Sequence, residues 1–437
     1  MPRAAAHSLK IPFLVFALSA LCFLGALRNG FVWDDGALLL KTYGFRQLDW
    51  PHLRWMFTTL RAANYCPLPW LSYGLDYAAW GLNPAGYHLN SLLLHAINAA
   101  LFYCVALRLL GLASRAEPRH LQPAAAFAAL AFALHPLRVE SVAWVSERRD
   151  VLSGLFFLAS ILFYLDAAAS ARDAGRRWRL TASIASFALA ALSKATVVPL
   201  PLVLLALDYF PLRRLDASTP RRRLISLALE KLPYVALSAV ASYLVVQAQQ
   251  ATSNLIPLAQ HDLQARLAQA CYGLGFYLHK TIWPAGLCAL YPLPLGLSIL
   301  SWPVAGSVLV LGGAALGLRL AGLEARARAV LWVYYGAMLL PVLGLVQNGP
   351  QLVALRYSYL SCLGWSLLAG GAVVSALRRW ESAPHWRPLL SAAALGLGLC
   401  AAAAQTQRQL MVWHDNITLW SQQLRCFPDS MLAHSNL

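Results

Sequence analysis

The sequence predicts an all-α polytopic membrane protein, and three observations lead to this fold class. Of the 437 residues, 59% are apolar and only 12% are charged, with a mean hydropathy of +0.55, which excludes an ordinary soluble globule. Apolar runs recur along the chain at lengths suited to a bilayer, which needs about 20 residues per helix. The basic residues behind the net charge of +17 gather in short loops between these runs. Basic residues in such loops set the orientation of membrane helices, so the positive charge does not indicate a nucleic-acid partner.

Eleven apolar runs are predicted to cross the membrane. The first run ends near Arg28 and Asn29, without a small-x-small cleavage site, so we interpret it as an uncleaved helix and not as a signal peptide. The predicted spans are 11–27, 87–107, 123–135, 151–167, 180–193, 195–211, 232–247, 303–320, 329–346, 357–377 and 388–404.

The arginines predict the orientation of these spans. They cluster in the loops 108–119, 172–179, 213–223, 319–328 and 378–387. All five loops lie on one side only if there are eleven spans and the apolar stretch 266–290 rests at the outer interface without crossing. The N-terminus is then cytoplasmic and the C-terminus is outside. The long segment 28–86 becomes the first outer loop, and the chemistry is expected on the outer face.

An acidic pair, Asp34 and Asp35, follows the first span in this outer loop. Asp-Asp-Gly before an apolar run is typical of a turn and a helix N-cap. A cap needs only one carboxylate, however, and a second one kept charged near low dielectric favours a functional role.

A polar stripe marks the span that begins near residue 87. His88, Ser91, His95 and Asn98 recur at i, i+3, i+7 and i+10 on one face of the helix. Hydrogen bonding between helices is at least as good an explanation as a substrate role. Two histidines seven residues apart lack the spacing of a helical metal pair, and we predict no metal site and no divalent-metal cofactor.

The segment HPLRVESVAWVSERRDVLSG, residues 135–154, places charges of both signs at the outer membrane boundary. A loop of snorkelling side chains is one interpretation, and a polar site is the other. We favour the site. Its charged residues are Arg138, Glu140, Glu147, Arg148, Arg149 and Asp150.

Two further cations are predicted at the outer edge. Lys194 separates two apolar runs that are each shorter than a full span, so a hairpin would leave it at membrane depth, where a cation needs an anionic partner. Arg356 opens an apolar helix at its outer end. Two cations that converge on one face suit a phosphate, which arginine binds bidentately.

The tail 405–437 is polar and amphipathic, and we predict it to be a separate unit from the membrane domain 1–404. The spacing of Trp420, Leu424, Pro428 and Ala433 is similar to the start of a helical-hairpin repeat, but one partial unit establishes no period.

The ordered motifs of the chain resemble a known family. They are VWDD, Y-x-PL, GYHLNSLLLHAIN, HPLRVESVAWVSERRDVLSG, LSK, LPLVLLALDYFPL, FYLHKTIWPAGLCALYP, GLVQ and RYSYL. Together they resemble bacterial membrane proteins with a tetratricopeptide-repeat (TPR) tail, which are similar to the transmembrane-and-TPR O-mannosyltransferases among the GT-C glycosyltransferases. The resemblance covers nearly the whole chain and implies a GT-C-like fold in a bacterial inner membrane.

The resemblance also implies a function. The donor is a polyprenyl-phosphate-linked sugar, mannose favoured, and the acceptor is a hydroxyl of a protein or glycan. Asp34 and Asp35 would supply the base and position the acceptor, while Lys194 and Arg356 bind the donor phosphate. The substrate pocket would contain Arg138, Glu140, Arg149, Asp150, His88, His95, Tyr65 and Tyr359.

Two departures from the family pattern bear on activity. Cys66 stands where the family usually has Arg, and Leu355 where it usually has Asp. Losing a cation and an anion together points to a lost ion pair or a changed substrate.

Two other classes of function compete with the transferase. A catalytically inactive scaffold that anchors an external TPR domain has no need of Lys194 and Arg356 at the outer edge. A transporter is disfavoured because no series of charges crosses to the cytoplasmic side.

Overall fold

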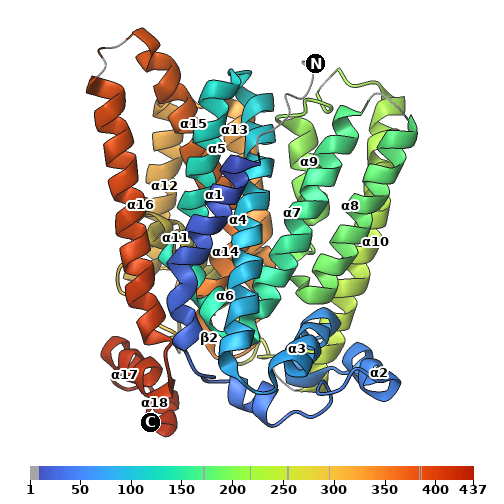
Figure 1. Ribbon diagram of the computed structural model, residues 1–437, viewed down its shortest axis with the longest axis vertical. Helices are drawn as coiled ribbons and strands as arrows, with labels where there is room; N and C mark the ends of the chain where they lie inside the picture. The colour runs from blue at the N-terminus through green and yellow to red at the C-terminus, as the bar shows by residue number, and fades with distance from the viewer. Residues whose placement is uncertain are drawn as a thin grey trace.

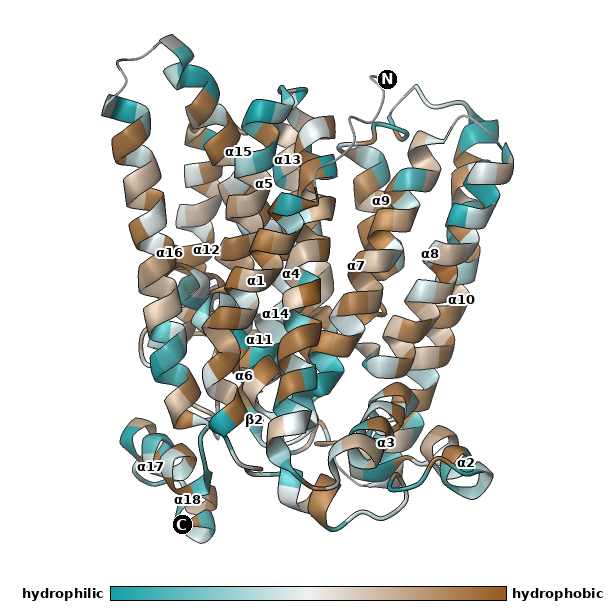
Figure 2. Ribbon diagram, viewed as in Figure 1, coloured by the Kyte–Doolittle hydropathy of each residue, from teal (hydrophilic) through white to brown (hydrophobic). Residues whose placement is uncertain are grey.

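A computed structural model of the chain describes residues 9–170, 173–216, 218–252, 255–294, 296–382, 384 and 386–437. Long helices run side by side between the two ends of the molecule, with the start of α1 (Lys10–Phe23) toward one end and the C-terminus at the other (Figure 1). Apolar residues dominate the middle of these helices, and hydrophilic residues gather at both ends (Figure 2). The all-α membrane fold class is confirmed.

The long helices are α1 (Lys10–Phe23), α4 (Pro84–Ser114), α5 (Pro118–Ala133), α7 (Arg148–Ala169), α8 (Asp173–Ser193), α9 (Leu200–Tyr209), α10 (Arg221–Ala251), α11 (Leu263–Ile282), α12 (Trp302–Leu320), α13 (Ala325–Leu339), α15 (Leu363–Arg379) and α16 (Trp386–Val412). Shorter helices are η1 (Leu24–Arg28), η2 (Gly36–Leu40), α2 (Trp50–Thr58), η3 (Arg61–Ala63), α3 (Pro67–Trp80), η4 (Pro136–Arg138), α6 (Val139–Ala143), η5 (Val145–Glu147), η6 (Ala195–Val197), η7 (Leu340–Val342), η8 (Leu355–Tyr357), α14 (Ser358–Ser361), η9 (Trp380–Ser382), α17 (Asn416–Cys426) and α18 (Met431–Asn436). A two-stranded antiparallel sheet pairs β1 (Tyr291–Pro292) with β2 (Gln351–Val353).

Six helices of the described chain are long and apolar enough to cross a membrane, or eight if two bent pairs each count as one span. A helix lies at each of the eleven predicted spans, but some, such as α9, are too short to pass this test alone. The count of eleven therefore stays a prediction. The two bent pairs are informative, because α5 turns by 55° into η4 and α6, and η8–α14 turns by 52° into α15. Broken helices at membrane depth are tolerated where they line a protein-enclosed site.

The basic loops meet at one end of the bundle, as their charge pattern predicts. Glu381 of the loop 378–387 lies 2.7 Å from Arg119, and Glu324 of the loop 319–328 lies 3.0 Å from Arg213. Arg214 and Arg176 both bind Glu230 of α10. Arg108 also pairs with Asp166 near the end of α7, shortly before the loop 172–179, so the contacts connect all five loops; residue 172 lies outside the described residues. Which side of a membrane this end faces stays a prediction.

Helices α8 and α9 form the predicted hairpin. Arg176, near the start of α8, and Arg214, after α9, reach the same carboxylate on α10, so the two open ends of the hairpin lie together. Lys194, between the helices, is therefore at the other end of the bundle, next to the predicted outer loops.

Both ends of α11 contact the outer ends of predicted spans, 329–346 at its start and 123–135 at its end. Near its start, Arg266 Nη1 donates to the carbonyl of Leu345 at 2.7 Å, and near its end the carbonyl of Thr281 accepts from His135 Nε2 at 3.1 Å. This geometry agrees with a stretch 266–290 that does not cross.

The C-terminal helices are attached to the same end of the bundle. Helix α16 continues through position 404 to Val412, so the predicted domain boundary falls inside a helix, and the division into two domains stays a prediction. A disulfide joins Cys288 to Cys426 at the end of α17, and the Gln423 side chain exchanges two hydrogen bonds with the backbone of Leu290. The sequence had given no sign of this disulfide. One pair of short helices, α17 and α18, does not show a TPR domain.

Candidate active site

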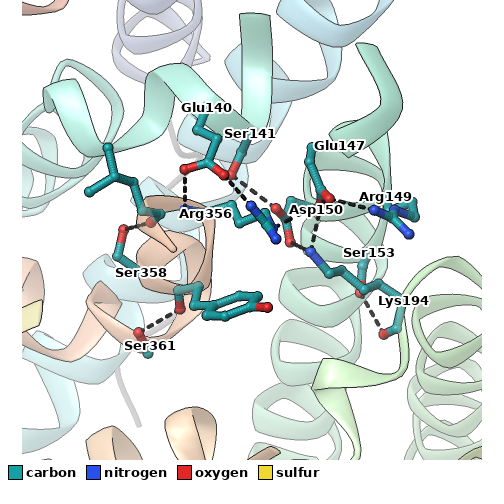
Figure 3. Close-up of polar contacts among 12 residues, drawn as sticks. Glu140, Ser141, Glu147, Arg149, Asp150, Ser153, Lys194, Arg356, Ser358 and Ser361 are labelled. Atoms are coloured by element: carbon teal, nitrogen blue, oxygen red, sulfur yellow. Dashed lines mark hydrogen bonds and ion pairs between the residues drawn. The ribbon is translucent and has the colours of Figure 1, made fainter. Parts of the chain in front are cut away.

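A network of buried charges lies where the broken helices meet (Figure 3). Its carboxylates are Glu140 on α6, Glu147 at the end of η5 and Asp150 in the first turn of α7. Its cations are Arg149 on α7, Lys194 between α8 and η6, and Arg356 on η8. Three stretches far apart in the chain, 140–150, Lys194 and Arg356, thus contribute to one cluster.

Glu147 is the centre of this network. Its Oε2 lies 2.8 Å from Lys194 Nζ, and its Oε1 lies 3.4 Å from Arg356 Nε and also contacts the Arg149 guanidinium. The residue is 1% exposed, so its charge is stabilised by the three cations and not by water. In the sequence Glu147 is one of the charged residues of the segment 135–154, but no role in the site was predicted for it. Its spacing to Asp150, three residues away and hence on one helical face, was the available signal.

Glu140 and Asp150 complete the pairing of the cations. Asp150 lies 2.7 Å from Lys194 Nζ and accepts from Ser141 Oγ at 3.0 Å. Glu140 accepts from the backbone N–H of Arg356 at 3.1 Å and pairs with its guanidinium. Lys194 therefore has the anionic partner that its depth demands.

A cavity of about 420 Å³ opens beside this network. Of the predicted site residues, Tyr65, Arg149, Lys194 and Arg356 line it. Its other walls carry amide side chains and valines; they include Asn64, Gln249, Gln269, Gln347, Gln351, Val198, Val245, Val246, Val342 and Val346. The cavity thus has a cationic end, amide-bearing walls and an apolar side.

The polar stripe of α4 lies in the helix packing and not on this cavity. His95 Nε2 donates to the carbonyl of Ala133 at 3.0 Å, which leaves Nδ1 to accept from the Tyr359 hydroxyl at 2.9 Å. Asn98 donates to the same hydroxyl at 2.9 Å. Gly154 of α7 lies so close that a Cβ there would sit 2.9 Å from Tyr359. For His95 and Tyr359, hydrogen bonding between helices is therefore what the geometry shows.

His88 and Arg138 are also enclosed. His88 is fully buried and donates to the carbonyl of Gly30 at 3.3 Å, which ties α4 to the first outer loop. Arg138 is 2% exposed and donates to the carbonyl of Ser358 at 2.7 Å. Both were predicted for the substrate pocket, but neither lines the cavity, because their donors are directed to backbone carbonyls of neighbouring segments.

Asp34 and Asp35 occupy opposite environments. Asp35 is fully buried; its Oδ1 accepts from the backbone N–H of Ser146 at 2.8 Å and also from the Ser146 hydroxyl, and its Oδ2 accepts from the N–H of Val32 at 3.1 Å. Burial raises the pKa of Asp35 to about 7 in spite of these donors. Asp35 thus fastens the first outer loop to η5, beside Glu147.

The Asp34 side chain is exposed. Desolvation by the surrounding protein raises the pKa of Asp34, and the positive charges of Arg149 and Arg356 oppose that rise. Asp34 therefore lies within electrostatic range of the cationic end of the cavity, without itself lining the cavity.

The backbone before Asp34 is strained. Trp33 has a φ of 53°, which is unfavourable for a bulky residue. Its ring stacks on Trp144 with centroids 4.6 Å apart, and its N–H donates to Asn416 Oδ1 on α17 at 2.8 Å. Contacts with the segment before η5 and with the tail helix therefore hold the turn that presents Asp34.

Within the described residues, no group of three or more His, Cys, Asp or Glu side chains is arranged to hold a metal ion. The expectation of a metal-free site stays a prediction.

Part of the chain is similar to curated protein O-mannosyl-transferases. Over 167 residues it is 32% identical to TMTC4 of Homo sapiens, covering 35% of this chain and 22% of that protein. Over 170 residues it is 32% identical to TMTC2 of Mus musculus, covering 37% and 19%. Over 157 residues it is 34% identical to Tmtc1 of Drosophila melanogaster, covering 34% and 17%. These matches confirm the resemblance to the O-mannosyltransferases over about a third of the chain; the TPR tail stays a prediction.

The chain spans about a fifth of the length of these relatives. No protein-family model matches it. Among solved structures, ArnT from Cupriavidus metallidurans bound to undecaprenyl phosphate is 16% identical with a TM-score of 0.44, over 97% of this chain and 78% of ArnT.

Proposed function

From this similarity to protein O-mannosyl-transferases, we propose that the chain is a membrane glycosyltransferase. It moves a sugar, mannose favoured, from a polyprenyl-phosphate donor to a hydroxyl of a protein or glycan. The reaction takes place at the end of the bundle that carries the cavity, which we assign to the outer face of a bacterial inner membrane, with the N-terminus in the cytoplasm.

The observation that carries this proposal is the convergence of Arg149, Lys194 and Arg356 on one cavity. Cations at the edge of a bilayer are costly, and fixed positive charge is what a departing phosphate requires. In the present structure these cations are paired with carboxylates, chiefly Glu147. A bound phosphate would take over part of that pairing.

The apolar side of the cavity supports a lipid-linked donor. Val246 of α10 and Val346, which follows η7, are 42% and 66% exposed while also lining the cavity. Exposed valines at this depth would contact lipid. A polyprenyl chain could therefore lie between α10 and the segment 341–346 with its phosphate at Lys194.

We assign the general base to Asp34. In the proposed reaction the acceptor hydroxyl oxygen bonds to C1 of the sugar, and its proton passes to the Asp34 carboxylate. The C1–O bond to the phosphate breaks, and the lipid phosphate leaves with the bonding electron pair toward Lys194 and Arg356. Asp34 suits this role better than Asp35, because the Asp34 carboxylate is exposed whereas both oxygens of Asp35 already accept hydrogen bonds.

The acceptor would approach beside the tail. Asn416 of α17 accepts from the N–H of Trp33, the residue before Asp34, and the disulfide between Cys288 and Cys426 fixes the other end of α17. A repeat domain that continued from α18 would be held next to the proposed base, where it would present a protein acceptor.

The test is transfer by the purified chain in lipid nanodiscs, with a short-chain polyprenyl-phosphate mannose as donor. A Ser/Thr-rich peptide and a glycan are offered as acceptors, since the acceptor class is part of the proposal. Release of polyprenyl phosphate together with a mannosylated acceptor is expected. A folded protein that binds no donor and transfers no sugar would instead favour the inactive scaffold that anchors an external domain.

A further inference from the structure

Two residues that line the cavity each carry a buried polar atom that has no hydrogen-bond partner within the part of the chain that the structure describes. These atoms are the carbonyl oxygen Oε1 of Gln249 and the Nε–H of Arg149. Desolvating an acceptor or a donor without a partner costs free energy, so such atoms call for an explanation such as a ligand. Both residues line the same cavity.

The orientation of the Gln249 amide is fixed by its other end. Its Nε2 donates to the carbonyl of Ala63 at 2.9 Å. Exchanging the amide nitrogen and oxygen would place Gln249 Oε1 against the Ala63 carbonyl, and two acceptors cannot form a hydrogen bond. Gln249 is 8% exposed and lies near the end of α10, while Ala63 ends η3 in the first outer loop with a φ of 58°. A strained residue and a buried amide thus fix the orientation of one unpaired acceptor on a residue that lines the cavity.

The two atoms match the chemistry of a sugar. A hydroxyl group both donates and accepts, so a polyhydroxylated ligand can donate to Gln249 and accept from Arg149. The lipid chain and the phosphate supply no hydroxyl donor, and the acceptor substrate would approach from Asp34, which does not line the cavity. The sugar is bonded to the phosphate and must lie in the same cavity.

We propose that Gln249 is a sugar-binding residue whose Oε1 accepts a hydrogen bond from a hydroxyl of the donor sugar, with Arg149 Nε as a second contact. This inference rests on the proposed function, and it names the residue that distinguishes a sugar-bearing lipid phosphate from a bare one. Gln249 stood in none of the motifs singled out in the sequence.

The experiment compares two probes on the full chain in nanodiscs, a short-chain polyprenyl-phosphate mannose and the same polyprenyl phosphate without sugar. Gln249→Leu is expected to weaken binding of the mannose-bearing lipid roughly tenfold, the effect of one lost buried hydrogen bond, and to leave binding of the bare lipid unchanged. Gln250→Leu, at the neighbouring exposed position, is the matched control and should change neither.

The Ala63 contact requires a second variant. Gln249→Glu keeps an acceptor oxygen and loses the donor to Ala63. Its added negative charge should weaken binding of both lipid phosphates, but it should keep the preference for the mannose-bearing lipid over the bare lipid, which Gln249→Leu should lose. Binding of deoxy-mannose donors tests the hydrogen bond itself, because a purely structural role of Gln249 would not make its variants respond differently to one missing sugar hydroxyl. One deoxy donor should bind the parent roughly tenfold less well. Gln249→Leu should be indifferent to that hydroxyl, whereas Gln249→Glu, which keeps an acceptor oxygen, should still lose affinity when it is removed.

Equal weakening of both lipids by Gln249→Leu would overturn the proposal and leave Gln249 as a tie between α10 and the first outer loop. The same conclusion follows if every deoxy donor costs Gln249→Leu as much affinity as it costs the parent. If the parent binds neither lipid, the proposed function itself fails, and the two failures are thereby distinguished.

Discussion

Lys194 Nζ lies 2.8 Å from Glu147 Oε2, and the same carboxylate also contacts Arg149 and Arg356. The buried Glu147 is therefore paired with all three cations that line the cavity. An anion that enters the cavity must compete with this carboxylate, so the affinity for a lipid phosphate depends on Glu147 as much as on the cations.

Replacing Glu147 with Gln should raise the affinity for polyprenyl phosphate. The amide keeps the shape of the side chain but no longer attracts the cations, and a charge-assisted hydrogen bond is worth about 1.5–3 kcal/mol. We expect roughly tenfold to a hundredfold tighter binding in a nanodisc binding assay, together with a lower Tm because three partly buried cations lose a partner. Weaker binding would show that Glu147 helps to hold the lipid phosphate in place.

Replacing Lys194 with Met should act in the opposite direction. Loss of the ammonium group removes one phosphate contact, so binding should weaken by about tenfold to a hundredfold. The Tm should also fall, since Glu147 and Asp150 both lose a cation at close range. Lys41→Met, which removes an exposed cation from the first outer loop, is the control and should alter neither quantity. Unchanged affinity in Lys194→Met would move the phosphate elsewhere.

The two neighbouring aspartates should respond differently to the same substitution. Asp34→Asn removes an exposed proton acceptor, so sugar transfer should fall about 10²- to 10⁴-fold while the Tm holds. Asp35→Asn should lower the Tm, because an amide NH₂ must then face the N–H of either Val32 or Ser146. Transfer rates and melting curves of both variants distinguish a catalytic role from a structural role for each aspartate. Parental transfer by Asp34→Asn would remove Asp34 from catalysis.

The buried Asp35 predicts a pH dependence of stability. Its pKa rises from 3.8 to about 7 on folding. Between these pH values the folded chain holds a proton that the unfolded chain has released, so the free energy of unfolding falls as the pH rises through this range. The Tm difference between the parent and Asp35→Asn should therefore shrink from pH 4 to pH 7. A difference that grows over this range would mean that Asp35 is ionised in the folded protein.

Single cysteines should reveal which end of the bundle faces outward. In a background without the six free cysteines but with the Cys288–Cys426 disulfide kept, cysteines at the exposed positions 283 and 350 should react with an impermeant thiol reagent. Cysteines at 177 and 222, in the basic loops, should react only after the membrane is opened. Position 148 is unsuitable, because Arg148 is buried against Asp76. Outside labelling at 177 or 222 would overturn the orientation.

The sequence by itself determined the fold class, the one-sided basic loops and the need for an anion beside Lys194. These follow from local composition and from the cost of charge at membrane depth, which any arrangement of the helices must satisfy. The ordered motifs also identified the resemblance that the curated relatives confirm.

The tertiary structure decided which partners meet. Lys194 pairs with Glu147 and Asp150, which are 47 and 44 positions away in the chain. His95 forms a hydrogen bond with Tyr359, 264 positions away. The choice between a helix-packing and a substrate role for His95 was open in the sequence for that reason. Asp34 and Asp35 are adjacent and chemically identical, yet one is exposed and the other is buried against Ser146. The free energy of a charged side chain depends on the solvent and the partners around it, and these are set by the packing of distant segments.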